Sequence, residues 1–405
     1  MTKRLVFYLI FLIVVSQGAG CQAVNESGQD AYRRIRGLKT GAEQTEKYLP
    51  LLKGKAVAVL TNQTGMIGKT HLVDSLLSLG VNIKKVMSPE HGFRGQAAAG
   101  THVKSGIDAK TGLPVISLYG SHRKPTAADL EDVDLVIFDV QDVGARFYTY
   151  ISTLHYLMEA CAENGKKLLI LDRPNPNGFY VDGPVLRKEF RSFVGMDPIP
   201  VVHGLTVGEY AMMLNGEGWL KDGEQCELQV IKVKGYDHTM RYKLPVPPSP
   251  NLPDMKSVYL YPSLCFFEGT VVSVGRGTSK PFQIFGHPDF KHYDTTFVPE
   301  PIPGKAPHPK LQGKLCKGFD VSVFGESMLP NMDRLYLFWL RSAYFDLGAE
   351  DNFFTPFFNK LAGTDSLRIM IERGKTEEEI RASWQADLKK YKLIRKKYLL
   401  YPDFE

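Results

Sequence analysis

Residues 134–172 read DLVIFDVQDVGARFYTYISTLHYLMEACAENGKKLLILD, and their pattern is the clearest indication of the fold class. The first seven and the last six residues are apolar runs rich in Val, Ile and Leu, as in strands buried on both faces. Residues 148–165 have the length of a helix and end in Asn-Gly, which is a C-terminal cap signal. A strand, a helix and a second strand in this order predict two parallel strands joined by a crossover helix.

The same alternation continues on the N-terminal side. Three more apolar runs, AVAVLTN (56–62), IKKVMSP (83–89) and PVISLYG (114–120), precede this stretch, with a helical segment at 71–80. Together they predict an α/β fold with a Rossmann-like parallel sheet that is covered by helices on both faces. The first strand leads into TNQTGMIG (61–68) and not into G-x-G-x-x-G, and no phosphate loop occurs, so no cofactor is expected.

The character of the chain changes after Asp172. A proline-rich tract, VPPSPNLP (246–253), precedes a glycine-rich and aromatic segment, and amphipathic helical stretches follow at 332–348 and 376–401. We expect a Rossmann-like domain over 41–245, a smaller α+β subdomain over 246–405, and the active-site cleft between them.

The first residues have the pattern of an export signal. Lys3 and Arg4 precede an apolar run over 5–15, and Gln-Gly-Ala-Gly (17–20) leads into Cys21. The run is shorter than the roughly 20 residues that a spanning helix needs. We expect a lipoprotein signal peptide over 1–20, lipid on Cys21, a tether over 21–40, and a location in the periplasm or on the cell surface. Ordinary secretion is the alternative.

Composition narrows the function further. The 405 residues carry a formal charge of +6, which is too small and too dispersed to indicate nucleic-acid binding. Apart from Cys21 the cysteines stand alone with no C-x-x-C pair, and we expect buried thiols, with a disulfide left open. They are Cys161, Cys226, Cys265 and Cys316.

Polar residues follow three of the predicted strands. Because the carboxyl ends of parallel strands meet at one edge of a sheet, these residues are the first candidates for a site. Helix caps and stiff turns are the structural alternatives. The candidates are Glu90, His91 and Arg94 after the second strand, Asp139, Gln141, Asp142 and Arg146 after the fourth, and Asp172 and Asn175 after the fifth.

Seven unusual strings occur in one order along the chain. They are SPEHGFRG (88–95), DVQDVGARFYTY (139–150), LDRPNPNG (171–178), GPVL (183–186), HGLTVGEYA (203–211), PSPNLP (248–253) and YPSLCFFEGTVVSVGRGTSKPFQIFG (261–286). Together they resemble a known family, the exo-β-N-acetylmuramidases of bacterial cell-wall recycling. The resemblance implies removal of terminal N-acetylmuramic acid from the non-reducing ends of peptidoglycan fragments by a Rossmann-like domain and a second subdomain that closes the cleft.

Glycoside hydrolysis needs a protonated carboxyl beside the leaving oxygen and usually a second carboxylate. Glu90 is the leading candidate, because it stands at a strand end between Pro89 and His91. Glu268 is the second, since apolar neighbours would raise its pKa; pairing with Arg276 is its structural alternative. Asp139 and Asp142 are alternates, and one of them would orient the 2-acetamido group if the substrate assists its own cleavage.

The lactyl group of the substrate carries a carboxylate, which suits the planar fork of an arginine. Arg94, Arg146 and Arg276 are the candidates, and the choice among them stays open. His91 and His203 are expected to bind sugar hydroxyls or help proton transfer. Gln141 and Asn175 complete the predicted substrate contacts, with Phe93, Tyr119, Tyr148 and Tyr261 as walls for a sugar ring.

Two other classes compete with the glycosidase. Glu90, His91, Asp139, Asp142 and Asp172 form a set that suits a divalent ion in a metal-dependent hydrolase, although no fixed-spacing metal motif supports it. A cleft between two α/β lobes is also what a non-catalytic sugar-binding lipoprotein offers.

Overall fold

Seven strands form the main sheet of the computed structural model, which describes residues 37–94, 105–349 and 352–405. All neighbouring strands are parallel except the edge strand β5, which is antiparallel to β6. The α/β fold and the five predicted strands are confirmed, and β5 and β9 are additional. In spatial order the strands are β5 (Gly106–Ile107), β6 (Pro114–Ser117), β4 (Asn82–Ser88), β1 (Ala56–Thr61), β7 (Leu135–Asp139), β8 (Lys167–Leu171) and β9 (Leu228–Ile231).

The apolar runs are continuous because each strand buries both of its faces. Val57 and Val59 of β1 pack in one core cluster with Tyr48 of α3, while Leu60 packs in a second cluster with Leu154 of α6. Alternate residues of β7 and β8 divide between the two clusters in the same way. The helices of this part are α3 (Thr45–Leu52), α4 (Leu72–Ser78), α5 (Ala127–Leu130), α6 (Tyr150–Glu163) and α7 (Val207–Gly216), and a small hairpin joins β2 (Met66–Ile67) to β3 (Thr70–His71).

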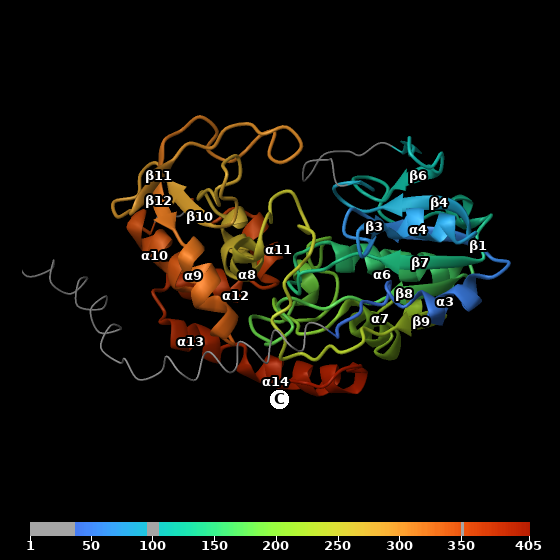
Figure 1. Cartoon of the computed structure of the whole chain (residues 1–405). Coiled ribbons are helices and arrows are strands. Elements are labelled where there is room, and N and C mark those ends of the chain that lie inside the picture. The colour runs from blue at the N-terminus through green and yellow to red at the C-terminus, as the bar shows by residue number, and fades with distance from the viewer. Residues whose placement is uncertain (1–36, 95–104, 350–351) are drawn as a thin grey trace, which may run out of the picture. The chain divides into compact units, whose positions relative to one another are not determined.

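A smaller α+β part follows, as predicted. Figure 1 shows its three-stranded sheet grouped with α8, α9 and α10, apart from the strands of the main sheet. Its antiparallel strands, in spatial order, are β10 (Ile284–His287), β12 (Cys316–Asp320) and β11 (Thr295–Phe297). Its helices are α8 (Met255–Leu264), the 3₁₀ helix η3 (Cys265–Gly269), α9 (Ser322–Ser327), α10 (Phe338–Asp346), α11 (Phe357–Ala362), α12 (Ser366–Glu372), α13 (Glu377–Ala382) and α14 (Gln385–Arg395).

Both long helices predicted for this part are shorter than expected. The helix predicted from residue 332 begins at Phe338, because the Leu335 N–H donates to the Asp182 carboxylate and the Tyr336 N–H to the Ser263 hydroxyl. The helix predicted over 376–401 is interrupted between Ala382 and Gln385. At the break the Trp384 indole N–H donates to Asp182, 3.0 Å away, so contacts with distant segments override the local periodicity.

The end of the chain returns to the main sheet. Tyr391 of α14 donates to the carbonyl of His203, and the buried Arg395 donates to the carbonyl of Gly204. The Tyr401 hydroxyl reaches the Asp172 carboxylate at the end of β8, 2.5 Å away. Residues 39–405 accordingly form one unit of contacts.

The predicted signal peptide over 1–20 and the lipid-bearing Cys21 lie outside the described residues, as does most of the tether. No helix in the described part of the chain combines the length and the apolar character that are needed to cross a bilayer. The four other cysteines are free and buried, as expected.

Candidate active site

A cavity of about 740 Å³ opens beside the carboxyl ends of β4 and β6. This volume lies in the range of small-molecule sites. Two carboxylates, Glu90 and Glu268, line it together with several cations. The Rossmann-like part contributes Glu90, Tyr119, Arg123, Phe147, Thr149 and residues 192–194; the α+β part contributes Tyr261, Cys265, Glu268, Ser273, Val274, Arg276, residues 305–310, Phe357, Lys360 and Leu361.

Glu90 stands where the sequence places it, just after β4. In the parallel pairing of β4 with β6, Ser88 is opposite Ser117, so Glu90 and Tyr119 leave neighbouring strand ends side by side. The Thr149 hydroxyl donates to Glu90 Oε2 at 3.1 Å. Glu90 is half-buried, which leaves its carboxyl group accessible from the cavity while Thr149 holds its orientation.

The turn after Glu90 depends on left-handed backbone at two positions. His91 has φ 72° and Gly92 has φ 77°. Glycine tolerates this conformation, but His91 is a strained exception that its buried contacts must stabilise. Its Nε2 lies 3.2 Å from the Ser249 hydroxyl, and the side chain is not among those that line the cavity. His91 therefore positions the turn that carries Glu90.

Glu268 and Arg276 form the second polar group of the cavity. Arg276 donates to both carboxylate oxygens, from Nε at 2.8 Å and from Nη2 at 2.9 Å. This is the pairing weighed as the structural alternative for Glu268. Burial lowers the pKa of Arg276, but Glu268 outweighs it and raises that pKa above its ordinary value. Glu268 thereby occupies the side of the Arg276 guanidinium that carries Nε and Nη2.

Lys310 is a lining residue that the sequence reasoning missed. Its ammonium donates to the carbonyls of Phe267, Glu268, Thr270 and Val272, where η3 ends. Burial lowers the pKa of Lys310 to about 8, against the attraction of Glu268. Lys310 thus fixes the backbone that carries Glu268.

The carboxylates predicted after β7 do not reach the cavity. Asp139 is fully buried and accepts two hydrogen bonds from Arg173, at 2.6 and 2.9 Å. Burial raises the pKa of Asp142 to about 7, although the Gly144 N–H donates to it at 2.6 Å. Gln141 donates to the Pro174 carbonyl at 2.7 Å. These side chains hold the sheet edge together, and none of them lines the cavity.

Two of the three predicted arginines are also placed elsewhere. Arg146 is fully buried and donates to four backbone carbonyls, at 2.7–2.9 Å. Arg94 pairs with Asp74 and Asp108. Of the three predicted arginines, Arg276 lines the cavity, whereas Arg94 and Arg146 do not.

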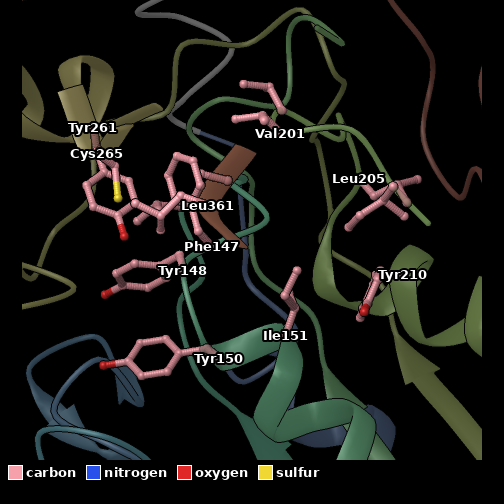
Figure 2. Close-up of a cluster of buried hydrophobic side chains, with 14 of the residues drawn as sticks. Phe147, Tyr148, Tyr150, Ile151, Val201, Leu205, Tyr210, Tyr261, Cys265 and Leu361 are labelled. Carbon is pink, nitrogen blue, oxygen red and sulfur yellow. The ribbon is translucent and has the colours of Figure 1, made fainter. Parts of the chain in front are cut away.

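The remaining predicted contacts are interior hydrogen bonds. Asn175 donates to the Leu205 carbonyl at 2.8 Å, and His203 accepts from the Leu205 N–H at 3.2 Å. Burial lowers the pKa of His203 to about 3. The Tyr148 hydroxyl donates to the Pro248 carbonyl at 2.9 Å, and in Figure 2 it points to the same side as the hydroxyl of Tyr150.

The reason for these placements is that the expected crevice is filled. Arg173 occupies the ends of β1 and β7, where its guanidinium contacts Asp139 and the Met66 carbonyl. The proline-rich segment lies over the same edge, since Gln63 donates to the carbonyls of Pro247 and Pro248. The opening is displaced toward β4 and β6.

Of the predicted sugar-ring walls, Tyr119 and Tyr261 line the cavity, whereas Phe93 packs edge-on against His71. Thr149 and Arg123 were missed. Thr149 lies within the motif that starts at Asp139, and Arg123 follows the third predicted strand. Applying the strand-end rule to that strand as well would have found Arg123.

The set proposed for a divalent ion is dispersed in the structure. Of Glu90, His91, Asp139, Asp142 and Asp172, Glu90 alone lines the cavity, and Arg173 binds both oxygens of Asp139. Across residues 37–94, 105–349 and 352–405, no three His, Cys, Asp or Glu side chains are grouped for metal binding.

Two carboxylates in a cavity that is also lined by tyrosines are compatible with glycoside hydrolysis. Family models described as exo-β-N-acetylmuramidase NamZ, N-terminal and C-terminal, match residues 57–256 and 259–401. The chain belongs to this NamZ family, and it is a glycosidase.

Relatives support the same assignment. The peptidoglycan β-N-acetylmuramidase NamZ of Bacillus subtilis (strain 168) is 38% identical over an alignment of 423 positions that covers 99% of this chain and 100% of that protein. Two crystal structures of DUF1343 family proteins from Bacteroides fragilis NCTC 9343 are 50% and 31% identical, with TM-scores of 0.84 and 0.73. Each match covers 90% of this chain and 99% of the other.

Proposed function

We propose that the protein releases terminal β-N-acetylmuramic acid from the non-reducing ends of peptidoglycan fragments, with Glu90 as general acid/base. The observation that carries the proposal is the position of Glu90, a strand-end carboxyl group in the cavity whose orientation is held by Thr149. The substrate class follows from the B. subtilis relative, whose name describes a peptidoglycan β-N-acetylmuramidase.

In this proposal Glu90 is the residue that transfers the proton during cleavage of the glycosidic bond. In its protonated form Glu90 donates to the glycosidic oxygen while the bond from that oxygen to the anomeric carbon breaks. The resulting carboxylate then takes a proton from the water that completes hydrolysis if the configuration is retained. Glu268 is the second carboxylate of the cavity, and Arg276 holds both of its oxygens. Attack by Glu268, by water or by the substrate's acetamido oxygen are the three routes compatible with this arrangement.

We also propose that the protein works outside the cytoplasm, held to a membrane by lipid on Cys21. The support is the positive and apolar start of the chain followed by small residues before that cysteine. Peptidoglycan, the source of the proposed substrate, also lies outside the cytoplasm.

The test of the catalytic role is Glu90→Gln, which keeps the shape of the side chain but removes proton transfer. We expect kcat on the natural disaccharide to fall by at least about a hundredfold, since general acid/base help is typically worth about 10²–10⁴-fold. Circular dichroism and binding of N-acetylmuramic acid should be unchanged. The exposed Glu131→Gln is the matched control.

A chromogenic substrate with a good leaving group separates the roles of the two carboxylates. Such a substrate needs little protonation, so it should rescue the variant that lacks the acid but not one that lacks a nucleophile or base. Near-normal turnover of the natural disaccharide by Glu90→Gln would assign Glu90 to binding and leave Glu268 as the remaining acidic candidate in the cavity.

A further inference from the structure

Arg123 lies in the loop after β6, at the wall of the cavity. Its guanidinium carbon is 4.4 Å from the centre of the Phe193 ring, and Phe193 is stacked on Tyr156 with ring centres 6.2 Å apart. A cation over an aromatic face is attracted by the ring quadrupole, which holds the guanidinium plane and leaves its edge N–H groups available. Arg123 is therefore oriented without being neutralised.

No carboxylate forms an ion pair with Arg123 within the described parts of the chain, and the side chain is exposed. The other cations of the cavity differ in this respect. Arg276 is bound side-on by Glu268, and the Lys310 ammonium is surrounded by four carbonyls. Lys305 and Lys360 are exposed point charges, which lack the planar fork that matches a carboxylate.

The position of Arg123 relative to Glu90 follows from the sheet. Since Ser88 and Ser117 are paired in β4 and β6, the loops that carry Glu90 and Arg123 leave adjacent strand ends into the same cavity. Glu90 is assigned to the bond at C1 of the muramic acid ring. The lactyl ether, with its carboxylate, is on C3 of that same ring, which places an anion close to the reacting bond.

We propose that Arg123, held on Phe193, binds the lactyl carboxylate in a bidentate manner and so selects N-acetylmuramic acid over N-acetylglucosamine. The inference rests on the proposed function. Of the arginines favoured from the sequence, Arg94 and Arg146 do not line the cavity, and Arg276 is bound by Glu268. Phe193 acts as a positioning residue, because it contacts Arg123 and not the carboxylate.

The experiment compares chromogenic β-N-acetylmuramide with the matching β-N-acetylglucosaminide. Wild type should prefer the muramide. Arg123→Ala should lower kcat/KM for the muramide by about tenfold or more, chiefly through KM, because the lactyl carboxylate loses a charge-assisted bidentate partner. Turnover of the glucosaminide should be unchanged. Arg123→Lys should restore part of the loss, and Phe193→Leu should cause a smaller one. Arg334→Ala, at an exposed surface pair, is the control.

Inhibition by free N-acetylmuramic acid and by N-acetylglucosamine gives the same comparison without catalysis. If wild type cleaves neither substrate, the proposed function fails, and direct binding of the two free sugars still decides the role of Arg123. An equal loss on both sugars would make Arg123 a general wall residue. If Arg123→Ala kept the wild-type preference for the muramide, the inference would be overturned. The clearest such result would be that Lys360→Ala loses that preference while Arg123→Ala keeps it.

Discussion

Arg146 joins three distant segments through one guanidinium. Nη1 donates to the carbonyls of Pro184 and Ile199, and Nη2 donates to those of Leu361 and Ala362. Burial lowers the pKa of Arg146 to about 9. The fit is close, since a Cβ at Gly363 would lie 2.6 Å from Nη2. Arg146 stabilises the fold because it supplies donors to four buried carbonyls, although burial disfavours its charge.

Replacing Arg146 by Met should therefore lower stability and not selectivity. It leaves buried carbonyls without donors, and each buried group left unsatisfied typically costs about 1–3 kcal/mol. Denaturant titration measures this loss in the free energy of unfolding. Arg94→Met, in a half-buried ion-pair cluster, is the control and should cost about 1 kcal/mol or less. Unchanged stability together with lost preference for muramides would return Arg146 to a binding role.

Helix α6 is tied to the segment that lines the cavity wall at 192–194 by a buried histidine. His155 Nδ1 lies 2.9 Å from Asp197 and its Nε2 lies 3.2 Å from Glu159, while the Tyr210 hydroxyl donates to Asp197. Burial would lower the pKa of His155, but the two carboxylates outweigh it and raise the pKa to about 9. Two cations face this cluster. Lys124 donates to Glu159, and Arg191 contacts His155 itself.

Stability should consequently depend on pH through His155. The unfolded histidine loses its proton near pH 6.5, whereas the folded one holds it to about pH 9. The stabilisation is complete below about 6.5 and is lost as pH rises through about 9. Calorimetry at pH 6 and pH 9 should show a smaller decrease in Tm for His155→Gln than for wild type. Equal decreases in the two proteins would show that His155 is neutral in the folded state.

At the scale of the whole molecule, the C-terminal segment packs against the end of β8 and not against the cavity. Tyr401 donates to Asp172, and its hydroxyl accepts from the Val233 N–H at 2.9 Å. Burial raises the pKa of Asp172 to about 6, against the hydrogen bonds that it accepts. The C-terminal segment thus covers the carboxyl end of β8 in the Rossmann-like part. The cavity takes lining residues from the Rossmann-like part and from the α+β part.

Cys21→Ser tests where the whole molecule is held. We expect the variant to leave the membrane fraction or to keep its signal peptide, because acyl chains on that cysteine provide the anchor. Fractionation and mass spectrometry of the mature protein measure both outcomes. A serine variant at an interior thiol, Cys316→Ser, should fractionate like wild type. A lipid-free wild type that fractionates as the Cys21→Ser variant does would exclude the anchor.

The strands could be predicted from the sequence because each is a local signal. Val57 to Leu60 are apolar at every position, which by itself requires helices on both sides of the sheet. Glu90 could be predicted for a similar reason, because it directly follows a strand, and residues that follow parallel strands project from the edge of the sheet. The break before Phe338 and the end of the helix at Ala382 could not, since Asp182, far away in the chain, accepts from the Leu335 backbone N–H and from the Trp384 indole N–H.

Which strand ends stay open was decided by the tertiary structure. Asp139 and Glu90 follow strands of the same sheet and look equivalent in the sequence. Arg173 binds Asp139, whereas Thr149 leaves Glu90 facing the cavity. Arg146 and Arg123 look equally suited to a carboxylate, but one is surrounded by carbonyls and the other stands exposed on Phe193. The physical reason is that a charge is available to substrate only if folding leaves it facing the cavity, and the segments that bury or neutralise the other charges are ones that no local pattern connects.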